Sequence, residues 1–314
     1  MNPIRTAVIG VGHQGRWHAE KFEALEHSRL VAVVDADGER AQAVGGELGV
    51  EGVTDYRDLF GRVDAVSVAT PTPSHYEIVG ALLEQGIHVL VEKPIASTLE
   101  EAGELVRLAE ARGLVFQVGH LERFNPAVMA VAPTVTQPRF IESLRIAPYQ
   151  PRGVDVSVVL DLMIHDIDLI HSFARSRAVR ADAVGRPIFS DNIDIANARI
   201  TFENGCVANV TSSRISLKKE RTIRIFESHA YHSIDLLTKQ ATSYRAAGEG
   251  PVDGPEDLAV QQAGFGASDA LLVQAEAFLE SVAGGPAPLV DGRTAMQALE
   301  TAATIGRLIE EQSP

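Results

Sequence analysis

The chain has 314 residues, which suits two domains better than one core, and hydrophobic residues make up 45% of it. Its formal net charge of −14 argues against a nucleic-acid or anionic-membrane partner, because like charges repel. A single cysteine, Cys206, excludes an internal disulfide, no apolar run is long enough to span a membrane, and no signal sequence is recognisable, so we expect a cytoplasmic protein.

The first 119 residues alternate short apolar runs with helical patterns, which predicts a parallel sheet covered by helices. The expected strands are residues 6–9, 30–34, 65–69, 88–91 and 115–118. The expected helices are residues 14–25, 39–48, 74–85 and 99–111. We place the first domain at residues 1–119.

A glycine-rich loop directly follows the first expected strand. Its residues are Gly10, Val11, Gly12, His13, Gln14 and Gly15. The first glycine permits a tight turn, the second lets the backbone approach a pyrophosphate, and the third lets the helix pack on the strand. The helix start offers N–H groups to the phosphates. The loop therefore predicts a dinucleotide site, and the alternative is a glycine turn in an ordinary α/β protein.

Asp35 ends the second expected strand, where a carboxylate can accept hydrogen bonds from the adenine-ribose hydroxyls but would repel a 2′-phosphate. This favours NAD over NADP. Arg40 argues the other way, since it could neutralise a phosphate if it folded back towards the ribose, although Glu39 stands beside it. We count both Asp35 and Arg40 among the cofactor-binding candidates.

Two further motifs follow strands of the same sheet. Glu92, Lys93 and Pro94 end the fourth expected strand at the edge where open parallel sheets bind ligands, so Lys93 is expected to point at the cofactor. A Lys-Pro bond can be cis. The alternative is an ordinary surface lysine. Thr70, Pro71 and His75 follow the third expected strand, where they could line the nicotinamide pocket or merely stiffen a turn and begin a helix.

After residue 126 longer β-like stretches replace the alternation, and we place a second domain at residues 120–294. The expected strands are residues 193–202, 206–212, 222–227, 233–237 and 241–244, with a hairpin at Asn204-Gly205. They indicate an open antiparallel sheet with residues 156–173 and 270–282 as helices on one face. Residues 248–266 are expected to be a surface loop, and the helix 295–311 could return to the first domain. The open face favours a homo-oligomer.

The helix expected at 156–173 carries the second candidate for chemistry. At about 100° per residue, Asp161, His165 and Asp168 share one narrow sector beside an apolar stripe. The stripe consists of Leu160, Met163, Ile164, Ile167 and Ile170. A carboxylate one turn from an imidazole can hold one ring nitrogen and leave the other for proton transfer. The alternatives are a surface ion pair and a metal site. A metal site needs further ligands, and the sequence has no metal-binding motif that would supply them, so we expect no metal.

Other polar groups are candidates for substrate contacts. Arg123 and Asn125, in the crossover segment between the domains, are expected to face a shared cleft. A basic group could meet an anionic substrate or could be a solvated loop. Its members are Arg214, Lys218, Lys219, Arg221 and Arg224.

These motifs, in this order and spacing, resemble those of the Gfo/Idh/MocA oxidoreductases over essentially the whole chain. The resemblance implies an α/β fold with an N-terminal Rossmann domain that binds NAD and a C-terminal α+β domain with a large open, mainly antiparallel sheet. It also implies a catalytic set of Lys93, Asp161 and His165, with the same three residues contacting the substrate. One departure is a missing glycine cluster before the aspartate, where residues 156–160 stand instead.

Within the family, residues 119–126 and 160–168 are most similar to those of bacterial UDP-N-acetylglucosamine 3-dehydrogenases. Those enzymes oxidise the sugar C3 hydroxyl, which prepares a diamino sugar for lipid A. The resemblance then implies that His165 is the general base and that Lys93 stabilises the alkoxide. An inositol or simple sugar dehydrogenase, and a non-catalytic NAD-dependent sensor or repressor, are the alternatives.

Overall fold

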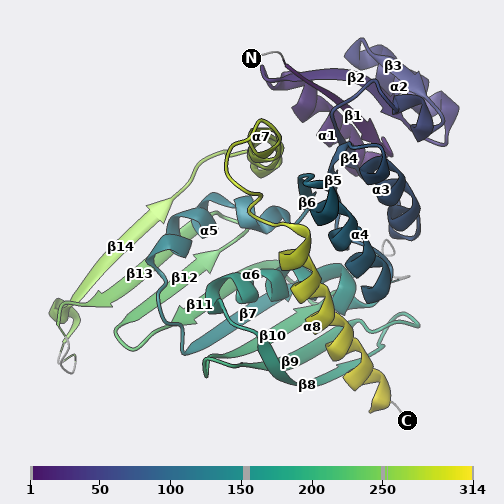
Figure 1. Cartoon of the computed structure of the whole chain (residues 1–314). Coiled ribbons are helices and arrows are strands. Elements are labelled where there is room, and N and C mark those ends of the chain that lie inside the picture. Colours follow the sequence, from purple (N-terminus) through teal and green to yellow (C-terminus); the bar gives the residue numbers. More distant parts are fainter. Residues whose placement is uncertain (1–2, 151–155, 249–251, 253, 313–314) are drawn as a thin grey trace. The chain divides into compact units, whose positions relative to one another are not determined.

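The computed structural model describes residues 3–150, 156–248, 252 and 254–312. It divides into two units, and Figure 1 colours the chain along both of them. Unit 1 consists of residues 1–121 and 269–296, and unit 2 of residues 122–268 and 297–314. The chain therefore crosses from unit 1 to unit 2, returns to unit 1 for residues 269–296, and ends in unit 2.

Unit 1 contains a six-stranded sheet in the order β3-β2-β1-β4-β5-β6, with every neighbouring pair parallel. Its strands are β1 (Ile4–Ile9), β2 (Ser28–Val34), β3 (Glu51–Val53), β4 (Ala65–Val68), β5 (His88–Val91) and β6 (Phe116–Val118). The helices between them are α1 (His13–Ala24), α2 (Gly38–Leu48), α3 (His75–Glu84) and α4 (Leu99–Arg112). The predicted alternation of strands and helices is confirmed.

The short strand β3 was not among the expected strands. It pairs with β2 through three residues only, and its centre is Gly52. A Cβ on Gly52 would lie 2.2 Å from the carbonyl oxygen of Ala41 on α2, so close helix packing requires glycine there. A three-residue strand without an apolar run gives no periodicity to recognise.

Helix α7 (Ala270–Val282) belongs to unit 1 and packs on α1. Phe22 of α1 and Phe278 of α7 stack with their ring centroids 6.4 Å apart, and both are fully buried. The prediction that residues 270–282 cover the antiparallel sheet is therefore wrong. An apolar helix face indicates burial, but the pattern does not say which surface covers it.

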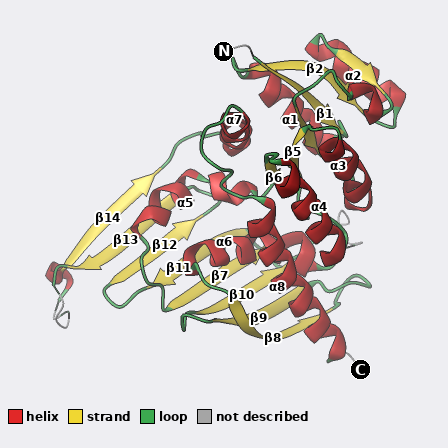
Figure 2. Ribbon diagram, in the orientation of Figure 1, coloured by secondary structure: helices red, strands yellow, loops and turns green. Residues whose placement is uncertain are grey.

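Unit 2 is built on an eight-stranded sheet in the order β14-β13-β12-β11-β7-β10-β9-β8 (Figure 2). Its strands are β7 (Phe140–Ile146), β8 (Ala178–Arg186), β9 (Ile195–Phe202), β10 (Val207–Ser213), β11 (Glu220–Phe226), β12 (Ala230–Asp235), β13 (Gln240–Ala246) and β14 (Leu258–Gly264). Only β7 and β10 pair in parallel. The predicted mainly antiparallel sheet is confirmed.

Helices cover one face of this sheet. These are α5 (Pro126–Val131), which lies on β12 and β13, and α6 (Ile164–Ala174), which lies on β7 and β10. The last helix, α8 (Gly292–Glu311), begins in unit 1, but its residues from 297 onwards belong to unit 2. Near its end Ile309 meets Gly185 of β8. None of the helices in the described ranges combines the length and hydropathy needed to cross a bilayer.

The predicted hairpin at Asn204-Gly205 joins β9 and β10, and Gly205 has a φ of +84°.

Three strands of unit 2, β7, β8 and β14, were not predicted, and the reason differs for each. Strand β7 was not foreseen because its inward positions include Ser143 and Arg145. Strand β8 exposes most of its side chains and was likewise not foreseen. Residues 258–264, predicted as loop, form the edge strand β14, whose exposed polar residues hide the period-two pattern.

Candidate active site

The glycine loop of unit 1 has the geometry that a dinucleotide requires. Gly10 has a φ of +82°, and a Cβ on Gly15 would lie 1.7 Å from the carbonyl oxygen of Gly10. A Cβ on Gly12, by contrast, would have no atom within 4 Å. The loop therefore leaves open space beside Gly12, at the N-terminus of α1, where backbone N–H groups can meet a pyrophosphate.

Asp35 joins this loop to the second strand. Its carboxylate is 8% exposed and accepts hydrogen bonds from the backbone N–H of Val11, at 2.9 Å, and of Asp37, at 3.0 Å. Arg40 donates to Asp35 at 3.1 Å and pairs with Asp37 at 3.0 Å. Asp37, which was not among the predicted site residues, caps α2 and pairs with the arginine that could otherwise neutralise a phosphate.

A groove of about 620 Å³ runs along these residues. Its lining includes Gly10, Gly12, Asp35, Arg40, Tyr56 and Thr70. Glycines occupy one part of the lining and a carboxylate with apolar neighbours occupies another. That distribution fits a pyrophosphate and an adenosine, so the residues present fit a bound NAD.

His75 ties two loops of unit 1 together. It is 1% exposed and begins α3, and its ring nitrogens lie 2.8 Å from the carbonyl oxygen of Thr70 and 2.9 Å from that of Pro94. Both nitrogens are therefore engaged by backbone. These contacts favour a positioning role, in which His75 fixes the Thr70 loop against the segment that follows Lys93.

The side chain of Glu92 is held by His18. The ring of His18, on α1, is completely buried, with Nε2 3.0 Å from a Glu92 carboxylate oxygen and Nδ1 2.9 Å from the Ser67 hydroxyl. Since the carboxylate can only accept, Nε2 carries the proton and Ser67 donates to Nδ1. Lys93 follows at the carboxyl end of β5, and the Lys93-Pro94 peptide is cis.

Asp161 and His165 belong to unit 2. Asp161 lies in a π-helical turn (Val159–Met163) that leads into α6, and His165 is the second residue of α6. The assumption of 100° per residue is therefore wrong between them, because a π-turn rotates each residue by less. The predicted apolar stripe is buried except for Leu160, which is half-buried. Asp161 and His165 are both half-buried.

Two ion pairs hold the first two turns of α6. Arg123 donates to Asp168 at 2.9 Å. Arg145 donates twice to Asp166, at 2.8 and 3.0 Å, and once to Glu122 at 3.0 Å. Burial alone would lower the pKa of Arg145, but the carboxylates of Asp166 and Glu122 raise it above its usual value. The guanidinium therefore stays charged, and the helix that carries His165 is fixed by charged partners.

Arg123 and Asn125 were expected to contact substrate. The Arg123 side chain is 12% exposed and pairs with Asp168. The Asn125 amide donates to Leu236 O at 3.0 Å and to Glu122 at 3.3 Å, and its oxygen accepts from Ala127 N at 3.1 Å. These contacts favour structural roles for both residues, Arg123 in holding α6 and Asn125 in capping α5.

The predicted basic group is dispersed among carboxylates. Arg214 lies 3.7 Å from Asp194, and Arg221 contacts Glu122 at 3.3 Å. Lys218 pairs with Glu220 and Arg224 with Glu142. Only Lys218, Lys219 and Arg224 of this group are exposed. The group is therefore not one continuous anion-binding surface.

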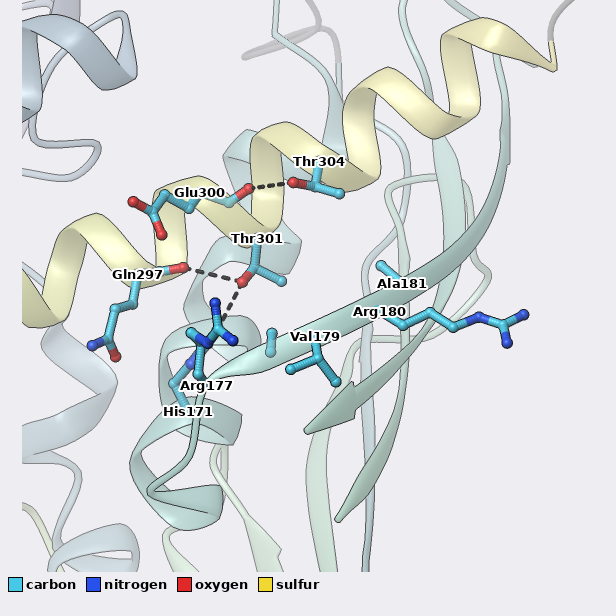
Figure 3. Close-up of a pocket in the computed structure, with 10 residues that line it drawn as sticks. His171, Arg177, Val179, Arg180, Ala181, Gln297, Glu300, Thr301 and Thr304 are labelled. Atoms are coloured by element: carbon cyan, nitrogen blue, oxygen red, sulfur yellow. Dashed lines mark hydrogen bonds between the residues drawn. The ribbon is translucent and has the colours of Figure 1, made fainter. Parts of the chain in front are cut away.

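A separate hollow of about 220 Å³ lies in unit 2 between α6, α8 and β8 (Figure 3). Thr301 donates its hydroxyl hydrogen to the Gln297 carbonyl and therefore accepts from His171 Nε2 at 2.8 Å, while Thr304 donates to the Glu300 carbonyl. Burial lowers the pKa of His171 to about 4, so its ring is neutral at neutral pH. We interpret these contacts as packing between helices.

Among the described residues, no group of three or more His, Cys, Asp and Glu side chains is arranged to hold a metal ion.

Comparisons with known proteins agree with this geometry. Residues 4–120 match the model of an oxidoreductase family with an NAD-binding Rossmann fold, and residues 142–233 match that of the GFO/IDH/MocA C-terminal domain. The resemblance found in the sequence motifs is thereby confirmed, as is NAD as the cofactor of the fold. The missing glycine cluster before Asp161 does not remove the chain from the family.

The relatives cover between about two thirds of the chain and nearly all of it. A UDP-N-acetylglucosamine 3-dehydrogenase of Acidithiobacillus ferrooxidans is 38% identical over 310 residues, which are 98% of this chain and 97% of that protein. Its solved structure superposes with a TM-score of 0.92 over 99% of both chains. The scyllo-inositol 2-dehydrogenase (NAD(+)) of Bacillus subtilis is 28% identical over 68% of each chain.

The Asp35 arrangement predicts a measurable cofactor preference. The protein should bind NADH at least about tenfold more tightly than NADPH, because the 2′-phosphate would face the carboxylates of Asp35 and Asp37. Replacing both with serine frees Arg40 and should narrow or reverse that preference. Fluorescence titration of each reduced cofactor measures it without any substrate. Arg40→Ala alone is the matched control, and a wild-type preference for NADPH would contradict the assignment.

Proposed function

Because the chain belongs to the Gfo/Idh/MocA family of NAD-binding oxidoreductases, we propose that it oxidises the C3 hydroxyl of UDP-N-acetylglucosamine to a ketone. The observation that carries this substrate is the 38% identity to a UDP-N-acetylglucosamine 3-dehydrogenase along nearly the full length of both chains. A sequence match over both domains is stronger support for a shared substrate than a match of the cofactor domain or of the fold alone.

In this proposal three side chains divide the work on the substrate. His165 accepts the proton of the C3 hydroxyl, Asp161 orients the imidazole, and Lys93 donates a hydrogen bond to the oxygen as it gains negative charge. Bound NAD supplies the acceptor for the hydride that leaves C3. The ion pairs of Arg123 and Arg145 support this role of His165, because they keep its helix from shifting.

One assay distinguishes the three candidate functions. Wild-type protein with NAD should produce NADH absorbance with UDP-N-acetylglucosamine and at least about tenfold less with myo-inositol or glucose. An inositol or simple sugar dehydrogenase would show the opposite order, since it does not need the nucleotide. A non-catalytic sensor would bind NADH and turn over none of the three, and either result would refute the proposed substrate.

The catalytic assignments predict the effect of two substitutions. His165→Ala and Lys93→Ala should each lower kcat by about a hundredfold or more, in line with usual acid–base and oxyanion contributions, while NADH still binds. Stopped-flow measurement of NADH formation with saturating substrate tests them. His171→Ala, on the same helix but in the packed hollow, serves as the matched control. Near-normal turnover in both active-site variants would remove their assignment.

We further propose that two copies associate through the uncovered face of the eight-stranded sheet. On β7, Arg145 reaches α6, so alternate residues such as Phe140 face the other side. There a row of apolar residues in register crosses six strands, with neighbouring ring centroids 5.0 to 5.9 Å apart. The row is Val207, Phe140, Phe226, Tyr231, Tyr244 and Val260. Such a row on a sheet face is typical of an interface.

Charges placed in the row should separate the copies. The double variant Phe226→Glu, Tyr231→Glu is expected to sediment as a smaller species than the wild-type protein, because two adjacent like charges cannot pair with each other and burying either one costs several kcal/mol. Analytical ultracentrifugation measures the change. Met129→Glu, at an exposed position on α5, which covers the opposite face of the sheet, is the control. A wild-type protein that sediments as a monomer would refute the association.

A further inference from the structure

Three loops of unit 2 are bound together at the end of the sheet where the π-turn begins. We call their described residues, 147–150, 156–158, 187–194 and 214–219, the rim. Ser216 N donates to Ala147 O at 3.0 Å, and Arg214 N donates to Asp194 O at 3.0 Å. Val158 N donates to Ile193 O at 2.9 Å, which ties the rim to the residue directly before the π-turn. The rim and the helix of His165 are therefore one continuous structure.

The rim concentrates exposed apolar side chains. It carries five of the fourteen large hydrophobic residues that are exposed in the described part of the chain. They are Tyr149, Val156, Ile188, Phe189 and Leu217. Phe189 is 65% exposed, and its ring meets that of Tyr149 edge to face with centroids 5.6 Å apart. A concentration of this kind on a soluble protein marks a binding surface.

The loop that presents Phe189 is held rigid from beneath. The carboxylate of Asp194 is fully buried, and one of its oxygens accepts hydrogen bonds from the N–H groups of Ile188, Phe189 and Ser190 at 2.7 to 3.0 Å. Its other oxygen accepts from the Ser190 hydroxyl at 2.8 Å. A loop fixed by four hydrogen bonds loses little conformational entropy when a ligand binds to its tip.

The rim is close to the proposed base along the chain. Val158, which Ile193 of the rim contacts directly, precedes His165 by seven residues, and the π-turn and the start of α6 span that interval. The rim and His165 therefore belong to one continuous segment of unit 2, as sites for two parts of one substrate would require. Lys218 and Lys219, both exposed on the rim, supply positive charge there, although Glu220 pairs with Lys218.

From these observations we infer that Tyr149 and Phe189 form a stacking site for the nucleoside base of the substrate. The inference rests on the proposed function, because only a nucleotide sugar has a base to stack. Aromatic rings bind bases through their π-faces, whereas the aliphatic rim residues exclude water around the stack. The rim therefore contributes to choosing a nucleotide sugar over a free sugar.

Titration of UDP into the full-length protein saturated with NADH tests the stacking site directly. Phe189→Ala and Tyr149→Ala should each weaken UDP binding at least about fivefold, since stacking on an aromatic ring strengthens base binding by roughly that factor or more. The KM for UDP-N-acetylglucosamine should rise in parallel while kcat stays within about twofold. Phe189→Trp should restore binding because it keeps a ring.

Leu289→Ala is the matched control, since it removes an exposed apolar side chain of unit 1, outside the rim, without removing a ring. UDP binding within about twofold of wild type in both ring variants would overturn the stacking site. If those variants changed only their sedimentation and not their UDP binding, the rim would be assigned to contact with a second copy instead. Wild-type protein that binds UDP through these rings but oxidises no UDP-sugar would refute the proposed reaction and keep the stacking site. Wild-type protein that binds no UDP would refute both.

Discussion

The contact between Gly15 and Gly10 is the constraint on which the cofactor site depends. A side chain at position 15 would overlap the Gly10 carbonyl at 1.7 Å, so α1 can approach β1 this closely only with glycine. That approach places the helix N-terminus and the open space beside Gly12 together. Asp35 then joins the same loop to β2 through the Val11 N–H. Strand, loop, helix and carboxylate thus form one rigid site for NAD.

The charged groups of unit 2 serve an equivalent purpose around the proposed base. Arg145 is 2% exposed, and such a buried charge is tolerated only where carboxylates surround it. Asp166 and Glu122 meet that need, and Asp166 is the residue directly after His165. These ion pairs add little to net stability. They hold α6 in one position, because proton and hydride transfer require the participating groups to be held in place.

Much of this could be predicted from the sequence, because its strongest signals are local. The glycine loop, Asp35 and the hairpin at Asn204-Gly205 each follow from backbone requirements within a few residues. The residues that were not foreseen act through distant contacts. His18 meets Glu92 across 74 positions, and Arg145 faces inward from β7 where an apolar residue is the rule. The π-turn at Asp161 covers only five residues, too few for its period to be distinguished from that of an α-helix, and the partner of α7 depends on tertiary packing.

We propose that this protein transfers the hydride at C3 of UDP-N-acetylglucosamine to NAD. The decisive experiment uses substrate labelled with deuterium at C3, incubated with NAD and wild-type protein. We expect deuterium at C4 of the nicotinamide in the NADH that forms, detected by mass spectrometry and proton NMR, and none when the label is at C2 or C4 of the sugar. NADH without deuterium from the C3-labelled substrate, or with deuterium from another carbon, would contradict it.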